Sequence, residues 1–414
     1  MAEDVQSLAA AARDAAMRGD FPRAQSLWAA IHRLDPRHPE GLRGLAVVAR
    51  QRGDLMQAAD YLVAAHQAAP QDATIPLMLA EVHRDANSPE GEAESVAIAL
   101  AIDPYCWPAL LMRAEAHRRA GRRGEAVTDF RNALIVAPPA PRWPPLYAER
   151  LAAAARDVAE FSEAFEAHLV QALGSSAGQG RWREAAAIMA GRTRPYHADC
   201  NQLTVPRLPA IPFFERDQFP WVDELEAKTN AIRAELLAAL EGQKTAFEPY
   251  IAYKPGEPVN QWRELNHSLR WSTYHLYRSG TPVSEHLARC PVTAEALSAV
   301  DMADIGGLCP NAMFSALAPH TEIPPHHGET NARLVVHLPL IVPDKCLYRV
   351  GFEERRWEVG KALIFDDTLE HTARNDSDEL RVVLIFDVWN PLLTMDERDQ
   401  VRALTSAARS FRFG

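Results

Sequence analysis

The chain has 414 residues, of which 47% are hydrophobic and 24% are charged, with a formal net charge of −11 and a pI near 5.8. This length and composition are typical of a globular protein of two or three domains. The negative charge and the lack of a basic stripe argue against nucleic acid or an anionic membrane surface as the main partner.

The first residues of the chain do not have the pattern of a targeting signal. Residues 1–20 begin with acids and lack a basic start followed by an apolar core. No later run approaches the ~20 apolar residues that cross a bilayer. The cysteines are odd in number and have neither CxxC nor CxH spacing, which favours neither a disulfide framework nor a zinc site: Cys106, Cys200, Cys290, Cys309 and Cys346. We therefore expect a cytoplasmic protein without a membrane span.

An internal repeat of 34 residues runs through the first 140 residues. Turn residues recur at this spacing, and so do prolines: Gly19, Gly53, Asn87 and Gly121, then Pro36, Pro70, Pro104 and Pro138. Asn tolerates the left-handed turn that Gly adopts, so Asn87 fits the series. Between these positions lie alanine-rich helical patterns. The period and the helix pairs resemble tetratricopeptide repeats.

The resemblance implies a helical solenoid over residues 1–191, with the helical patterns at 144–173 and 181–191 closing the array. Its concave surface could dock a peptide or protein substrate, or the array could serve as a scaffold. Proline then recurs and the helical period fails, so we predict a linker at 192–207.

The rest of the chain, 208–414, is predicted to be a second domain. An amphipathic helix is expected over 221–242, a loop and helix over 281–305 and a C-terminal helix over 396–411. Five strand-length apolar runs separated by turn residues predict a small all-β barrel or jelly roll: 313–317, 332–342, 347–350, 361–365 and 380–386.

Two of these runs place arginines on a strand face. The period of two groups Arg333 with Val335 and His337, and it groups Arg381 with Asp387, opposite wholly apolar faces. These faces line either the barrel interior or the surface, where the arginines would form ordinary salt bridges. An interior arginine needs an anion.

Histidines occur in two predicted loops, 323–331 and 365–371, that border the strands. The usual non-haem iron site has a His, an acidic residue two positions later and a distant second His. His326 is followed two positions later by Gly328, so the position of the acid is empty. Glu329 and His327 are the local substitutes, and the sequence leaves open whether either reaches a metal.

Four ordered motifs resemble the aspartyl/asparaginyl β-hydroxylase family: F-S-x-L-x-P at 314–319, P-H-x-G-x-T-N-x-R-L-x-x-H-L at 325–338, W-x-x-G-K-x-L-I-F-D-D-x-x-E-H at 357–371 and R-x-x-x-I-F-D-V-W-x-P at 381–391. The resemblance covers about 208–395. It implies a double-stranded β-helix that uses Fe(II), 2-oxoglutarate and O2, and whose iron is held by two histidines with water in place of the acid.

Position by position, the resemblance implies the following roles. His326 and His371 are the metal ligands. Arg381 pairs with the distal carboxylate of 2-oxoglutarate. Three further residues lie around this co-substrate: Trp271, Ser315 and His337. Arg333 would meet the substrate. Without the resemblance, Asp366 and Asp367 fit an ordinary acidic turn.

The substrate is less well specified. Val335 stands where the animal protein hydroxylases have a second arginine. The leading expectation is hydroxylation of the β-carbon of an Asp or Asn residue in a peptide or protein. Alternatives are a free or carrier-bound amino acid, a fatty acyl chain, or a repeat-based interaction protein with an inactive barrel.

Overall fold

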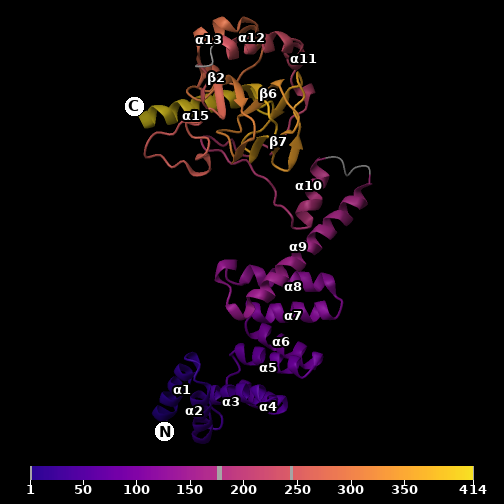
Figure 1. Cartoon of the computed structure of the whole chain (residues 1–414), viewed down its shortest axis with the longest axis vertical. Helices are drawn as coiled ribbons and strands as arrows, with labels where there is room; N and C mark the ends of the chain where they lie inside the picture. Colours follow the sequence, from indigo (N-terminus) through magenta and orange to yellow (C-terminus); the bar gives the residue numbers. More distant parts are fainter. Residues whose placement is uncertain (1, 175–179, 243–245, 414) are drawn as a thin grey trace. The chain divides into compact units, whose positions relative to one another are not determined.

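The computed structural model describes residues 2–174, 180–242 and 246–413. The chain divides into two compact units, one formed by residues 1–174 with 189–192 and the other by 175–188 with 193–414. The first unit contains only helices among its described residues, and the second contains two antiparallel sheets with helices (Figure 1). This α plus β, multidomain architecture confirms the predicted fold class.

The helices up to residue 189 are short and come in consecutive pairs, except for a longer helix α9. Their bounds are α1 Ala2–Met17, α2 Phe21–Leu34, α3 Pro39–Gln51, α4 Leu55–Ala68, α5 Thr74–Asp85, α6 Pro89–Ile102, α7 Trp107–Arg119, α8 Arg123–Val136, α9 Pro145–Leu173 and α10 Gly180–Met189, with a 3-10 turn at Ala140–Arg142.

The predicted turn residues take the conformation that the 34-residue repeat requires. Gly19, Gly53, Asn87 and Gly121 have φ of +76°, +81°, +53° and +72°. Each lies between the two helices of a pair, where a left-handed residue ends the first helix. The one non-glycine is Asn, which adopts this region more readily than other side chains. The tetratricopeptide-like array predicted from the sequence is thereby confirmed.

Small and apolar side chains form the core of the array. Ala58, Leu62 and Ala65 of α4 are fully or almost fully buried, and they pack with Ile75 of α5 in the next pair. Gly44 of α3 faces the indole of Trp28 so closely that a Cβ atom would lie 2.1 Å from the ring. Small residues therefore let neighbouring helices approach and bury apolar side chains between them.

The second unit is built on two antiparallel sheets. The larger has the strand order β1-β2-β4-β11-β6-β9, with β3 beside β2, and the smaller has the order β5-β10-β7-β8. The strand bounds are β1 Glu248–Pro249, β2 Trp271–Arg278, β3 Thr281–Pro282, β4 Ala312–Leu317, β5 Thr321–His326, β6 Arg333–Ile341, β7 Cys346–Val350, β8 Glu353–Arg355, β9 Leu363–Phe365, β10 His371–Asn375 and β11 Arg381–Trp389.

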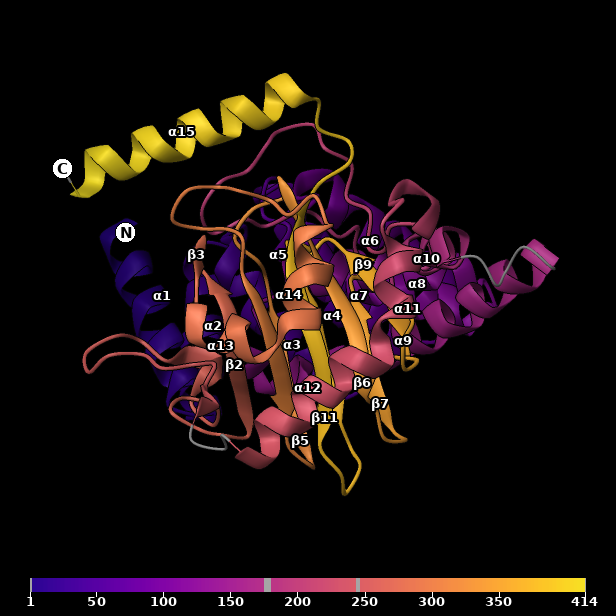
Figure 2. The same cartoon turned by 90° about the horizontal axis from the view of Figure 1, so that it is seen from above.

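Helices cover one face of the larger sheet, as Figure 2 shows for α11, α12 and α14. The helices of this unit are α11 Val222–Ala227, α12 Thr229–Gly242, α13 Ser284–Arg289, α14 Pro291–Ser298 and α15 Met395–Phe413, with 3-10 turns at Arg216–Gln218 and Asn260–Trp262. The prediction of one continuous helix over 221–242 is wrong in one respect. The helical segment is interrupted at Lys228, where the Thr229 hydroxyl donates to the carbonyl of Glu226 at 2.6 Å.

The alternation predicted for the two arginine-bearing strands decides what each sheet face contacts. Leu334, Val336 and Leu338 of β6 pack under the helices. Val335 belongs instead to a second cluster that includes side chains of the smaller sheet, such as Tyr348. The face that carries Arg333 and His337 is therefore the barrel interior, and both faces of the strand are buried.

The five cysteines are free thiols. Within the described ranges, no helix combines the length and the apolar character needed to cross a membrane.

Candidate active site

Two histidines face each other across neighbouring strands of the smaller sheet. His326 ends β5 and His371 begins β10, they are direct cross-strand partners, and their ring centroids lie 3.9 Å apart. The expectation that both histidines lie in loops is wrong. Pro324 and Pro325 argue against a strand when the sequence alone is considered. However, β5 is an edge strand of the smaller sheet, and an edge strand tolerates proline because one of its sides forms no ladder hydrogen bonds.

The hydrogen bonds of these rings fix which nitrogen carries the proton. Nδ1 of His326 lies 2.8 Å from the carbonyl of Pro324, and Nδ1 of His371 lies 3.0 Å from the carbonyl of Leu369. A carbonyl only accepts, so each Nδ1 donates and each Nε2 keeps a lone pair. Burial, with the neighbouring His371, lowers the pKa of His326 to about 3, and burial lowers the pKa of His371 to about 4. Two neutral imidazoles with free Nε2 atoms are the form that binds a metal.

Asp367 explains why no acid stands two positions after His326. A Cβ atom on Gly328 would lie 2.2 Å from the Asp367 carboxylate, and the Gly328 N–H donates to the Asp367 carbonyl at 2.7 Å. Any side chain at position 328 would thus collide with Asp367. Across the part of the chain that the structure describes, no group of three or more His, Cys, Asp or Glu side chains is arranged to hold a metal.

The local substitutes for that acid have other partners. The His327 ring donates from Nδ1 to the carbonyl of Thr368 at 2.9 Å, and Glu329 lies 3.4 Å from Arg333. Asp366 accepts bonds from the backbone and hydroxyl of Thr368, the turn chemistry expected of it. The donor set that fits a metal is therefore the His326–His371 pair.

Arg381 is a buried cation that has no counter-ion among the residues that the structure describes. It is 1% exposed, and its guanidinium lies 4.6 Å from the ring centre of Trp357. Its Nε has no hydrogen-bond partner, and among the described residues no carboxylate forms an ion pair with it. Burial lowers its pKa to about 10. A buried guanidinium in this state calls for an anionic ligand.

The other residues expected around a co-substrate lie in the same cavity of about 670 Å³ as Arg381 and the histidine pair. The Trp271 indole donates to the Ser315 hydroxyl at 3.1 Å and stacks on Tyr250 with centroids 4.0 Å apart. The Trp357 indole donates to Nδ1 of His337 at 3.3 Å, which leaves Nε2 as the protonated nitrogen of a neutral ring. Burial, with Arg381 and His371 nearby, lowers the pKa of His337 well below its usual value.

Arg333 has a different environment, although it is also buried at 5% exposure. Its guanidinium lies 2.8 Å from Asp367, 3.4 Å from Asp387 and 3.4 Å from Glu329. Although burial opposes it, the field of Asp367 and Asp387 raises the pKa of Arg333 well above its usual value. Three carboxylates thus already surround this one cation.

Two contributors to the site escaped sequence reasoning. The sequence places Asp387 on the same strand face as Arg381. Its ion pair with Arg333 on the neighbouring strand β6 can be predicted only when the register of β6 and β11 is known. Residues 199–205, read as part of a linker, bring Asp199 and Asn201 to the cavity wall. Nothing in their composition signals this, because prolines and polar residues are equally typical of linkers.

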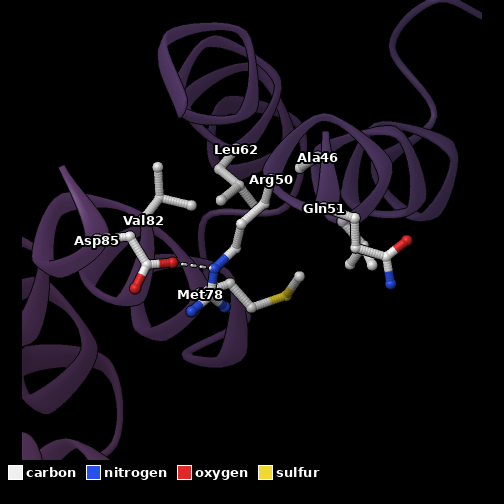
Figure 3. Close-up of a pocket in the computed structure, with 8 residues that line it drawn as sticks. Ala46, Arg50, Gln51, Leu62, Met78, Val82 and Asp85 are labelled. Carbon is white, nitrogen blue, oxygen red and sulfur yellow. Dashed lines mark hydrogen bonds and ion pairs between the residues drawn. The ribbon is translucent and has the colours of Figure 1, made fainter. Parts of the chain in front are cut away.

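A second cavity, of about 330 Å³, lies among the helical repeats (Figure 3). Arg50 projects between Leu62 and Met78, and it pairs with Asp85 at 2.6 Å and Glu81 at 2.5 Å. The charge of Arg50 is therefore neutralised by ion pairs within the repeats, unlike the charge of Arg381.

Fold and site together define a double-stranded β-helix with a histidine pair and a buried arginine inside the barrel. Residues 226–391 match the family model of aspartyl/asparaginyl beta-hydroxylase. This match agrees with the resemblance of the four sequence motifs to that family.

Three similar proteins each match less than half of the chain. An ornithine lipid ester-linked acyl 2-hydroxylase of Rhizobium tropici is 35% identical over 47% of this chain and 66% of its own length. The aspartyl/asparaginyl beta-hydroxylase of Mus musculus is 33% identical over 44% of this chain and 23% of its own length. This chain thus spans less than two thirds of either relative. A solved TPR protein of Thermus thermophilus is 19% identical over 44% of this chain and 97% of its own, with a TM-score of 0.32.

Proposed function

We propose that this protein is an Fe(II)- and 2-oxoglutarate-dependent dioxygenase that hydroxylates an unactivated carbon. The observation that carries the proposal is one cavity that holds both a neutral histidine pair and a buried, unpaired guanidinium. The first suits a divalent metal, and the second suits the carboxylate of a co-substrate.

The roles of the individual residues follow from their contacts. His326 and His371 would hold Fe(II) through Nε2, and the iron with 2-oxoglutarate and O2 would supply the oxidising power. Arg381 would bind the distal carboxylate of 2-oxoglutarate, with the Ser315 hydroxyl, held by Trp271, as a further donor.

Aromatic side chains shield this part of the cavity from water. Tyr348 and Phe365 are 3% and 1% exposed, and Tyr348 stacks on Trp357, whose ring lies under Arg381. A dry, low-dielectric wall strengthens the arginine–carboxylate interaction and keeps reactive species from bulk solvent.

One candidate substrate is the β-carbon of an Asp or Asn residue in a peptide or protein, docked by the helical repeats. The family match and the repeat array support it. Arg333 would then contact the acidic or amide side chain. Its three carboxylate neighbours suit an amide, which can donate to them, better than a second negative charge.

A second candidate is a free or carrier-bound amino acid or a fatty acyl chain. Val335 favours it, because this cavity-lining position carries a branched apolar side chain and no cation. The similarity to a relative named as an acyl 2-hydroxylase also supports it. A further possibility, from another class, is an interaction protein whose barrel is inactive.

One experiment separates enzyme from inactive barrel. We expect succinate to form from 2-oxoglutarate in the presence of Fe(II), and His326→Ala and His371→Ala each to abolish it. His320→Ala is the matched control, because this exposed histidine bonds Asp378 at 2.9 Å and does not line the cavity. An unreactive wild type that binds no metal would support the inactive barrel.

Substrate class is then tested by mass spectrometry. Asn- and Asp-containing peptides, free amino acids and acyl conjugates are each incubated with enzyme, Fe(II), 2-oxoglutarate and O2. Gain of one oxygen atom by the peptides alone supports the first candidate, and gain by the acyl conjugates alone contradicts it.

A further inference from the structure

The segment before the barrel is bonded to the loop that follows His326. Backbone N–H groups of Asn201, Gln202 and Leu203 donate to carbonyls of this loop at 3.3, 3.0 and 3.2 Å, the first to Gly328 and the other two to Glu329. Leu203 also forms a parallel bridge with Thr330. These residues precede 226–391, the part matched by the family model.

Asn331 completes this contact with its side chain. Its Oδ1 accepts from the Val205 N–H at 2.8 Å, and its Nδ2 donates to the Val205 carbonyl at 2.9 Å. The amide thus imitates a backbone partner in a sheet. Asn331 is 3% exposed, and its own carbonyl accepts from the Asn390 side chain at 3.0 Å.

The loop is therefore held on two sides. On one side the Gly328 N–H donates to the Asp367 carbonyl at 2.7 Å, and on the other the Gly328 carbonyl accepts from Asn201. The same segment reaches the turn before His371, because the Asp199 N–H donates to the Thr368 carbonyl at 2.9 Å. One stretch of chain thus binds the backbone next to both histidines.

We propose that residues 199–205 form a clasp, fastened by Asn331, that positions the loop after His326 and thereby sets the metal affinity of the histidine pair. Asn331 is a positioning residue, since it acts through the backbone of this loop. The inference rests on the proposed function for its metal, while the clasp itself is a property of the fold.

The physical reason lies in the short reach of the loop. Only six residues separate His326 from Arg333, where β6 begins, and they include Gly328, which lacks a side chain to pack. Without the clasp, the carbonyls of Gly328 and Glu329 would lose their partners, and the loop would sample more conformations. Residues that orient metal ligands indirectly typically change metal affinity about 10- to 100-fold.

The test uses the full chain and Co(II), a divalent probe that is followed by its visible absorption. Asn331→Ala removes both bonds to Val205, and Gln202→Pro removes the N–H that bonds Glu329. We expect each to weaken Co(II) binding at least about tenfold. Gln202→Ala keeps the N–H and has an exposed side chain, so it should bind like wild type.

Asn375→Ala controls for the loss of a buried amide. Asn375 is fully buried and donates to the carbonyls of Leu317, Ala318 and Glu379, but it does not line the cavity. Replacement of Asn375 should lower stability and leave Co(II) affinity within about twofold of wild type, since Asn375 has no contact with the loop after His326.

Amide hydrogen exchange gives a readout that needs no metal. Asn331→Ala should increase exchange at Gln202, Leu203 and Val205, whereas Asn375→Ala should not. Unchanged Co(II) affinity in both Asn331→Ala and Gln202→Pro would overturn the proposal, and so would unchanged exchange.

Failure of the proposed function gives a different result. Wild type would then bind Co(II) no better than His326→Ala, while hydrogen exchange would still decide whether the clasp holds the loop. If Asn331→Ala does not fold, Gln202→Pro tests the proposal instead, because the exposed side chain of Gln202 contributes nothing to the core.

Discussion

Two buried arginines in one cavity differ in what surrounds them. Arg333 has three carboxylates within 3.4 Å, whereas Arg381 has the face of Trp357 and no ion-pair partner among the described residues. A buried charge without a partner is costly, so it is kept where a ligand supplies the partner. The contrast assigns anion binding to Arg381.

Substitution of Arg381 tests this assignment. We expect Arg381→Lys to raise the KM for 2-oxoglutarate about 10- to 100-fold, because one charged, forked hydrogen-bond donor is worth ~1.5–3 kcal/mol. Steady-state succinate formation measures it. Arg374→Lys is the control, since this exposed arginine of β10 in the smaller sheet pairs with Asp376. Equal effects of the two substitutions would refute the assignment.

Gly328 tests the reason for the missing acid. Gly328→Ala should weaken Co(II) binding about tenfold, because its Cβ would push the Asp367 carboxylate away. Gly328→Asp should not create a tighter, three-ligand site for the same reason. Gly306→Ala, where a Cβ atom meets nothing within 4 Å, is the control. Tighter Co(II) binding by Gly328→Asp, measured by titration, would show that the Asp367 carboxylate can move aside, and would contradict this explanation.

At the scale of single elements, short segments are held by their neighbours more than by their own propensity. Strand β10 has five residues and pairs with β5 on one side and β7 on the other, and this pairing brings His371 opposite His326. In the repeats, Asp20 and Asp54 cap α2 and α4 by accepting from N–H groups three residues later. Local signals therefore place the helices, whereas pairing places the strands.

Two glycines of the same repeat give opposite predictions. Gly121 has φ of +72°, so Gly121→Ala should destabilise the helical unit by ~1 kcal/mol. Gly124 lies in the first turn of α8, where a Cβ atom meets nothing within 4 Å, so Gly124→Ala should stabilise it by up to ~1 kcal/mol. Urea denaturation followed by circular dichroism measures both. The same sign for both changes would contradict this account of the turns.

At the scale of the whole molecule, each unit has its own apolar core. The helical unit buries clusters such as that around Leu62, and the barrel unit buries one cluster under its helices and another between its sheets. Separate cores permit separate unfolding transitions.

Ligand binding should then stabilise one transition alone. In calorimetry, Co(II) at about 100 times its Kd should raise the free energy of unfolding of the barrel unit by ~2.7 kcal/mol. The transition of the helical unit should stay unchanged, and His326→Ala should remove the shift. A shift of both transitions together would show that the units unfold as one.

The sequence by itself determined the features that depend on local periodicity. The 34-residue spacing predicted the turns at Gly19, Gly53 and Gly121, because a left-handed residue is a local requirement. The period of two sorted Leu334 from Arg333 correctly, because side chains alternate along any strand. The four motifs also indicated the family whose model matches residues 226–391.

Only the tertiary structure decided which residues meet. It placed Asp387 and Asp367 next to Arg333, gave Arg381 no acidic partner within the described ranges, and put residues 199–205 against the loop after His326. The reason is that these contacts join segments far apart in the sequence, such as Val205 and Asn331, which are 126 residues apart. Strand register and chain path set such contacts, and neither has a local signature in the sequence.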